Sequence, residues 1–364
     1  MPGSNPIKRL FDLYTSDLSY QEIERLIKQE AGEVYEFFAK EIPKPDKNKS
    51  KLRRGLIFGR SLFNAFILKL TPARRVFYLA AILFFIVGYY GPNNAYLLLS
   101  FIILNLLIAF ELADKLSAKG ELEVAQKIQS VLIPKHSPKI FNYEVASYYE
   151  PAREVGGDYF DLIETKENAF LVVGDISGKG MAAALYMVRA QAIIHMLLEN
   201  LSAVKEIIID LKKYFSKNLK KEYFLTLSMA SIDREGRVKI CRAGHMPTFW
   251  YKKQIDDFEV ISPSGIAIGL NDRGIFEKTL EEISIQPSEN DILFFFTDGI
   301  SEAMNERFQM FGEERIKQVI KKYADRPASD IRAMLLTSLS LFRGTAAQND
   351  DLTFVILKAD QFSS

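Results

Sequence analysis

Residues 156–180 read GGDYFDLIETKENAFLVVGDISGKG and contain two aspartates, Asp158 and Asp175, each beside a glycine. The apolar run from Ala169 to Val173 predicts a buried strand that delivers Asp175 to its end. Glycine lets backbone and ligand approach closely, and hard cations such as Mg²⁺ and Mn²⁺ prefer carboxylate oxygens. The stretch therefore predicts carboxylates gathered around a divalent cation.

Two later segments have the same form. Residues 291–299, DILFFFTDG, predict an apolar strand ending at Asp298, and residues 349–357, NDDLTFVIL, predict a strand preceded by Asp350 and Asp351. Any one of these aspartates alone is most simply a turn or cap residue. Together they are better explained by a cation, because clustered carboxylates in a cleft would otherwise repel one another strongly.

Six motifs follow one another along the chain: EVGGDYFD, GDISGKG, RAGHMP, FTDGISEAMN, FGEERI and NDDLT. In this order they resemble the RsbU/SpoIIE branch of the PP2C-type (PPM) metal-dependent serine/threonine phosphatases. The resemblance covers roughly residues 121–358. It implies an α+β fold with a PP2C-like α-β-β-α sandwich at residues 136–360, which the alternation of strand and helix patterns permits without singling it out.

The resemblance also implies a set of site residues. Two Mn²⁺ or Mg²⁺ ions would be held by Asp158, Asp175, the backbone carbonyl of Ile176, Asp298 and Asp350. Asp175 would bridge both ions, and Asp351 would cap or hydrogen-bond nearby instead of ligating. The aspartates would act in catalysis through a metal-bound water that attacks phosphorus, so no cysteine or histidine nucleophile is needed.

Four further positions lie in or beside these motifs. Ser177 stands where eukaryotic relatives carry a histidine proposed as the acid for the leaving group. Arg153 has the spacing of their phosphate-binding arginine, and the alternative is a solvent-exposed or structural arginine. His245 in RAGHMP favours a structural hydrogen-bonding role over proton transfer, and Lys179 does not complete a nucleotide-binding P-loop.

Composition excludes several classes of function. Lys and Arg number 47 against 46 Asp and Glu, so nothing favours bulk nucleic-acid binding. The single cysteine, Cys241, rules out an internal disulfide framework and fits a reducing compartment. The histidines, His136, His195 and His245, are too scattered along the chain to favour a zinc site.

Residues 71–111 predict a transmembrane helical hairpin. Residues 76–110 carry no charged side chain, and Gly-Pro-Asn-Asn at 91–94 divides them into halves just long enough to cross a bilayer. Eleven basic residues between 40 and 75 then place both ends in the cytoplasm. We expect a multi-pass protein of the inner membrane, in contact with lipid, whose catalytic domain faces the cytoplasm. The alternative is a buried helical hairpin of a soluble domain.

The remaining segments flank this hairpin. Residues 1–70 predict an N-terminal cytoplasmic region that is helical and basic. Residues 112–135 predict a linker helix, in which AQKIQSVLIP is similar to a helix that precedes the catalytic domain in the family. That similarity implies a homodimer formed through the linker helix, against the alternative of a plain connection.

Taken together, the resemblance implies a phosphatase acting on phosphoserine or phosphothreonine of a partner protein. Within the family the usual partner is a phosphorylated STAS-domain anti-sigma-factor antagonist, which implies bacterial signalling by partner switching. The alternative function is a catalytically silent, membrane-anchored scaffold that binds a phosphoprotein. We expect no nucleic-acid partner.

Overall fold

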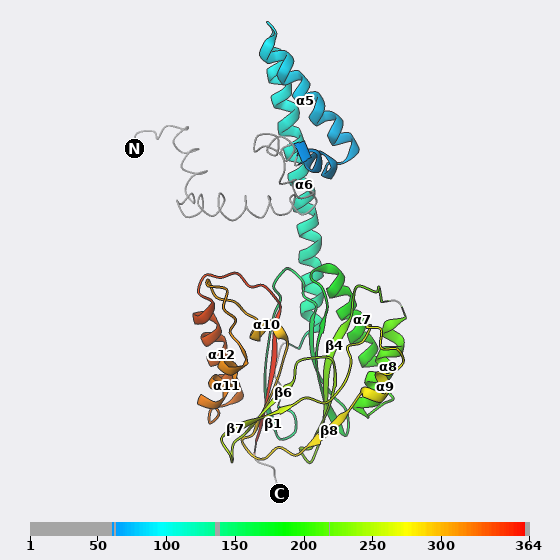
Figure 1. Cartoon of the computed structure of the whole chain (residues 1–364), viewed down its shortest axis with the longest axis vertical. Helices are drawn as coiled ribbons and strands as arrows, with labels where there is room; N and C mark the ends of the chain where they lie inside the picture. The colour runs from blue at the N-terminus through cyan, green and yellow to red at the C-terminus, as the bar shows by residue number, and fades with distance from the viewer. Residues whose placement is uncertain (1–59, 62, 135–138, 218, 361–364) are drawn as a thin grey trace, which may run out of the picture. The chain divides into compact units, whose positions relative to one another are not determined.

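The computed structural model describes residues 60–61, 63–134, 139–217 and 219–360 (Figure 1). It divides into two compact units, Met1–Ser117 and Ala118–Ser364, and each is described by itself. The helix and most of the basic region expected within residues 1–70 lie outside the described residues.

The first unit contains a helical hairpin. Helix α5 (Pro72–Tyr90) packs antiparallel against the first part of α6 (Ala95–Leu132). A Cβ atom at Gly88 would lie 2.7 Å from the backbone nitrogen of Leu97, so only glycine allows the helices to approach this closely. The hairpin expected at residues 71–111 is thus present, and its second helix continues without a break through the expected linker as far as Leu132.

Among the described residues, three helices are long and apolar enough to cross a membrane, namely α5, α6 and α7 (Met181–Leu198). In the most apolar 18-residue window of each helix, 11% of α5, 6% of α6 and 44% of α7 is buried within the protein. Helix α7 is therefore a core helix of the second unit. The apolar side chains of the hairpin are largely left uncovered.

The second unit is built on two antiparallel five-stranded sheets. One sheet has the order β1-β10-β9-β6-β7 and the other β2-β3-β4-β5-β8. The first consists of β1 (Tyr143–Glu150), β10 (Leu352–Ala359), β9 (Ile292–Phe296), β6 (Thr248–Lys252) and β7 (Asp257–Ile261). The second consists of β2 (Asp158–Glu164), β3 (Asn168–Ile176), β4 (Leu225–Asp233), β5 (Val238–Ala243) and β8 (Glu282–Ile285).

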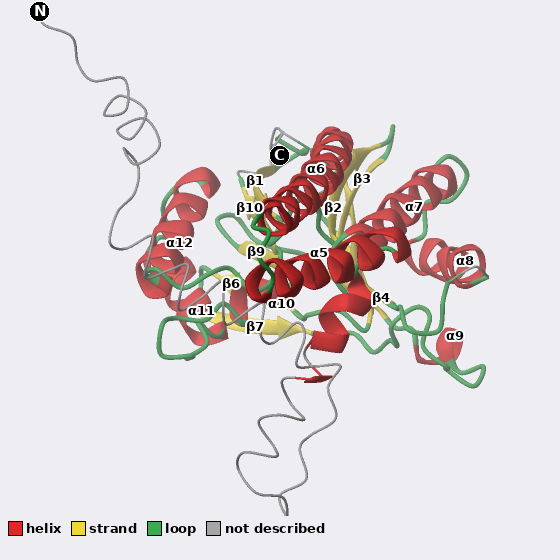
Figure 2. Cartoon of the chain, turned by 90° about the horizontal axis from the view of Figure 1, so that it is seen from above, coloured by secondary structure: helices red, strands yellow, loops and turns green. Residues whose placement is uncertain are grey.

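Helices cover the outer face of each sheet, as the view from above shows (Figure 2). The β2-containing sheet is covered by α7, α8 (Val204–Ser216) and the short α9 (Phe276–Thr279). Helices α11 (Glu313–Lys322) and α12 (Ala328–Arg343) cover the other sheet, and the short α10 (Asp298–Ser301) follows β9. The expected α-β-β-α sandwich is confirmed.

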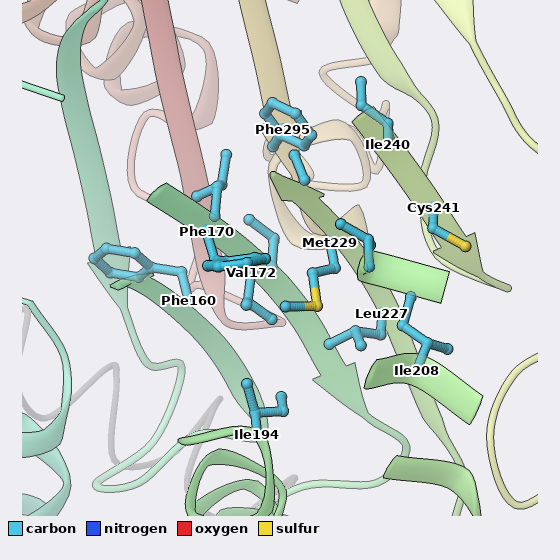
Figure 3. Close-up of a cluster of buried hydrophobic side chains, with 14 of the residues drawn as sticks. Phe160, Phe170, Val172, Ile194, Ile208, Leu227, Met229, Ile240, Cys241 and Phe295 are labelled. Atoms are coloured by element: carbon cyan, nitrogen blue, oxygen red, sulfur yellow. The ribbon is translucent and has the colours of Figure 1, made fainter. Parts of the chain in front are cut away.

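The apolar strands owe their composition to burial on both faces. In β9, Leu293 and Phe295 belong to the core between the sheets, which extends under α7 and α8 and includes the side chains drawn in Figure 3. The alternate residues Phe294 and Phe296 belong to the second core, under α11 and α12. Because side chains alternate along a strand, a continuous apolar run can supply both cores at once.

Candidate metal centre

Asp158 and Asp175 lie directly opposite each other. Asp158 begins β2, Asp175 lies near the end of β3, and the two are Cα partners in the antiparallel pair. Only 2% of Asp158 is exposed, and its Oδ2 accepts a hydrogen bond of 2.8 Å from the hydroxyl of Thr297. Since Thr297 follows β9, this bond joins the two sheets at the carboxylates.

Asp298 and Asp350 reach the same place from the other sheet. Asp298 opens α10 immediately after β9, and Asp350 precedes β10. A Cβ atom at Gly299 would lie 1.9 Å from the carbonyl oxygen of Asp351, so glycine is required for α10 to pack against this segment. In the sequence Thr-Asp-Gly, Asp298 therefore supplies a carboxylate, and Gly299 lets the backbone of α10 approach that of Asp351.

The charges of these carboxylates act on one another. Burial, reinforced by the charges of Asp175 and Asp351, raises the pKa of Asp158 well above its ordinary value. Burial and the charges of Asp298 and Asp350 raise the pKa of Asp175 to about 7. Burial raises the pKa of Asp298 too, with Asp350 among the charges that contribute. The sequence-predicted aspartates are therefore brought together.

The backbone carbonyl of Ile176 lies close to Gly157. A Cβ atom at Gly157 would lie 2.8 Å from the carbonyl oxygen of Ile176 and 3.5 Å from Asp175 Oδ1. Glycine at this position therefore leaves the Ile176 carbonyl close to the loop that carries Asp158. An oxygen donor is available there in addition to the side chains.

Asp351 has the hydrogen-bonding role expected of it. Its carboxylate accepts hydrogen bonds from the backbone N–H groups of Ala152 at 2.8 Å, Gly157 at 2.7 Å and Asp158 at 3.3 Å. These bonds fix the β1–β2 loop to the start of β10. The two adjacent aspartates of NDDLT thus serve different purposes, because Asp351 shapes the loop and Asp350 faces the cluster.

Gln129 of α6 holds the same loop from the other side. Its side-chain amide donates to the carbonyl of Gly156 at 2.7 Å and accepts from the N–H of Gly156 at 3.1 Å. Gln129 is only 4% exposed. A buried side chain that satisfies both backbone groups of one residue fixes the backbone two residues before Asp158.

Three other residues singled out in the sequence have less direct roles. Arg153 is exposed, and among the described residues it has no hydrogen-bond or ion-pair partner. Ser177 accepts from the backbone N–H of Phe224 at 2.8 Å. His245 is buried and bonded to the hydroxyl of Thr226 at 2.8 Å, and burial lowers its pKa to about 3. A neutral, hydrogen-bonded imidazole agrees with the structural role expected for it.

The sequence analysis did not predict that Lys179 pairs with Asp350. Its ammonium lies 2.8 Å from Asp350 Oδ2 and also donates to the carbonyl of Asn349. The P-loop pattern was the wrong test for this lysine. Its position between glycines directly after Asp175, in GDISGKG, is the signal that could have found it.

The donor set is chemically suited to divalent cations, but its side chains would have to move to ligate one ion together. Among the described residues, no three His, Cys, Asp or Glu side chains are grouped closely enough to hold an ion as they stand. Asp350 is instead paired with Lys179 at 2.8 Å. Burial raises the pKa values of Asp158, Asp175 and Asp298, and carboxylate oxygens of this kind match Mg²⁺ or Mn²⁺.

Comparison with known proteins identifies the family. A profile of the family described as Stage II sporulation protein E (SpoIIE) matches residues 165–360, more than half of the chain. The chain belongs to the SpoIIE family. The matched region of this SpoIIE-family chain includes Asp175, Asp298 and Asp350.

Curated relatives are phosphatases by name. The chain is 23% identical over 244 residues to phosphoserine phosphatase RsbU of Bacillus subtilis, an alignment that covers 66% of this chain and 70% of RsbU. It is 24% identical over 251 residues to phosphoserine phosphatase RsbP of the same organism, covering 67% of this chain but only 59% of RsbP.

Solved structures show the same fold. The SiaA-PP2C domain of Pseudomonas aeruginosa aligns with a TM-score of 0.59 at 18% identity, covering 68% of this chain and 99% of that one. The PP2C phosphatase domain of SpoIIE from Bacillus subtilis, with a fragment of its regulatory domain, aligns with a TM-score of 0.52 at 20% identity, covering 61% of this chain and 64% of that one. The SpoIIE-family chain therefore has the PP2C fold, and family and fold together make it a metal-dependent protein serine/threonine phosphatase.

Proposed function

We propose that Asp158, Asp175, the Ile176 carbonyl, Asp298 and Asp350 hold two Mn²⁺ or Mg²⁺ ions and form the phosphatase centre of this chain. The observation that carries the proposal is the pairing of Asp158 with Asp175 across β2 and β3, next to the loop whose Lys179 holds Asp350 at 2.8 Å. Bound divalent ions supply an activated water and neutralise charge on the phosphoryl oxygens. The chain's own residues orient the ligands through Thr297, Asp351 and Gln129.

Hydrolysis of p-nitrophenyl phosphate and of a phosphoserine peptide tests this proposal. We expect activity that requires added Mn²⁺ or Mg²⁺, is abolished by a chelator, and falls by ~100-fold or more in Asp175→Asn and in Asp298→Asn. Asp257→Asn, an exposed position at the start of β7, is the matched control and should keep wild-type activity. Activity that survives both cluster substitutions would refute the assignment. A chain that binds the phosphopeptide without cleaving it would be the scaffold instead.

The proposed physiological substrate is a phosphoserine or phosphothreonine protein, specifically a phosphorylated STAS-domain anti-sigma-factor antagonist in a bacterial partner-switching pathway. The support is family membership and similarity to proteins named phosphoserine phosphatase. The test is release of phosphate from the phosphorylated STAS-domain antagonist encoded in the same genome, with Asp175→Asn as the control. We propose that Arg153 binds the phosphate of this substrate, since it is exposed and has no hydrogen-bond or ion-pair partner among the residues that the structure describes.

We also propose that α5 and the first part of α6 cross the inner membrane and leave the catalytic domain in the cytoplasm. Their most apolar windows are 11% and 6% buried, which leaves these side chains free to contact lipid. Arg74, at the base of the hairpin, pairs with Glu111 at 2.9 Å and Asp114 at 2.8 Å, which keeps charged groups of both helices at one end. Because Cys241 is buried, a cysteine introduced at Asn93 should react with a membrane-impermeant thiol reagent from outside intact cells. Reaction only after cell lysis would contradict this topology.

A homodimer through α6 completes the proposal. Val124, Ile128 and Val131 recur at helical spacing, and their exposed fractions are 56%, 59% and 72%. A second copy of the same helix would cover these apolar side chains. Sedimentation of the detergent-solubilised chain should show a dimer that Ile128→Glu converts to a monomer. Gln126→Glu, at an exposed position on the opposite face of α6, should leave the dimer intact.

A further inference from the structure

Lys179 reaches the carboxylate cluster from a loop whose shape does not depend on it. The loop follows β3, and its glycines, Gly178 and Gly180, have φ values of 95° and 77°. Ser177 fixes the loop to Phe224 through its backbone N–H, at 2.9 Å, and through its hydroxyl, at 2.8 Å. The lysine side chain itself is 43% exposed. The backbone of the loop is therefore held by contacts that do not involve the Lys179 side chain.

The ammonium of Lys179 is held by the segment that carries a proposed metal ligand. It lies 2.8 Å from Asp350 Oδ2 and donates to the carbonyl of Asn349. Its charge also acts on the rest of the cluster, since it lowers the pKa of Asp175 and of Asp298 against the effect of their burial. Lys179 thus offsets part of the negative charge that a divalent ion would neutralise.

On the basis of the proposed metal assignment, we infer that Lys179 is a displaceable internal cation that lowers the affinity of the site for divalent metal. An ion that binds Asp350 has to take the oxygen from the ammonium and must also bear the repulsion of a nearby positive charge. The Asp350 side chain is 44% exposed, so the ion pair is weak enough to be displaced. Occupancy of the site would then depend on the concentration of free metal.

Calorimetric titration of the metal-stripped full chain with MnCl₂, in detergent, tests this role by binding alone. Lys179→Met should lower the Mn²⁺ dissociation constant by about tenfold, equivalent to ~1.4 kcal/mol. Lys179→Arg keeps the positive charge and should bind Mn²⁺ as the wild type does. Lys166→Met is the control, because it removes the same charge at the far turn of the β2–β3 hairpin, ~20 Å along the strands from Asp175. This distance exceeds the ~10 Å Debye length, so the Mn²⁺ dissociation constant should not change.

The possible results separate this inference from the assignment on which it rests. Unchanged or weaker Mn²⁺ binding in Lys179→Met, with normal binding by the wild type, would overturn the inference and leave the metal assignment standing. Equal tightening in Lys166→Met would also overturn it, because net charge and not position would then be the cause. A wild-type chain that binds no Mn²⁺, or an Asp175→Asn chain that binds it normally, would overturn the assignment and the inference together.

Discussion

Gln129 and Gly156 are joined by a pair of hydrogen bonds, of 2.7 and 3.1 Å, between one side-chain amide and both backbone groups of one residue. Gly156 lies two residues before Asp158, and the N–H of the intervening Gly157 donates to Asp351 at 2.7 Å. The loop that begins β2 is therefore fixed by a helix on one side and by the start of β10 on the other. The position of the first proposed metal ligand depends on contacts that are remote in sequence.

The Gln129 contact predicts a clear stability difference along one helix. Gln129→Ala removes both hydrogen bonds and leaves the backbone groups of Gly156 buried without partners, so the free energy of unfolding should fall by ~2 kcal/mol. Gln126→Ala, one turn earlier at an exposed position of α6, should change it by less than ~0.5 kcal/mol. Urea unfolding of the two variants measures the difference, and equal stabilities would show that the contact is not formed in solution.

The raised pKa of Asp175 predicts a pH dependence in the presence of a chelator. Its pKa rises from 3.8 to about 7 on folding, so the ionised form opposes folding. The penalty is absent below pH 3.8, grows as the pH rises, and is complete above about pH 7. Each pH unit in that window costs at most ~1.4 kcal/mol.

Asp175→Asn should therefore become progressively more stable than the wild type between pH 4 and pH 7, a window set by the same two pKa values. Thermal unfolding in chelating buffer across this range measures the difference. Added Mn²⁺ should reverse the order, because only the wild-type chain gains stability from the bound ion. A stability difference that does not vary with pH would mean that the carboxylate is not perturbed by the cluster.

Adjacent aspartates in NDDLT should respond differently to the same substitution. Asp351→Asn weakens hydrogen bonds to three backbone N–H groups and should lower the free energy of unfolding by ~2 to 3 kcal/mol. Asp350→Asn loses an ion pair that is nearly half exposed and should cost less than ~1 kcal/mol, yet it should weaken Mn²⁺ binding strongly. Unfolding and Mn²⁺ titration on both variants compare the two effects, and the opposite ranking would exchange the two roles.

Local patterns predicted much of the fold and of the site. The strands that deliver Asp175 and Asp298 are continuous apolar runs, and the structure confirms them as β3 and β9. Strand β2 was not predicted, because DYFDLIE contains a charged residue in its middle. That residue, Asp161, is tolerated in the core because Tyr159 donates to it at 2.9 Å and His195 Nε2 lies 2.6 Å away.

The convergence of the site could not be derived from local patterns. Thr297 and Asp158 are 139 residues apart, and Asp351 and Gly157 are 194 apart, so no spacing rule connects them. Only the family resemblance implied that these segments meet. The sequence also suggested a boundary between hairpin and linker where charged residues begin, at Glu111. In the structure α6 continues through this position as one helix. No proline or glycine between Ala95 and Lys119 ends that helix.

Replacing the large side chain of Phe308 with glycine should stabilise the fold. It has a φ of 58° and is 84% exposed, in a loop after α10 that Asn305 closes by accepting from the N–H groups of Arg307 and Gln309. An L-residue in this left-handed conformation costs ~1 to 2 kcal/mol, whereas glycine adopts it freely. Because the ring buries little surface, Phe308→Gly should raise the free energy of unfolding by ~1 kcal/mol.

The matched control for Phe308 is Ile255, which is 65% exposed in the β6–β7 turn and has no positive φ. Ile255→Gly relieves no strain and increases the conformational freedom of the unfolded chain, so it should lower the free energy of unfolding by ~0.4 to 1 kcal/mol. Urea unfolding of the two variants should therefore give shifts of opposite sign from the same chemical change. A loss of stability in Phe308→Gly equal to that in the control would mean that the loop relaxes around Phe308 in solution and stores no strain.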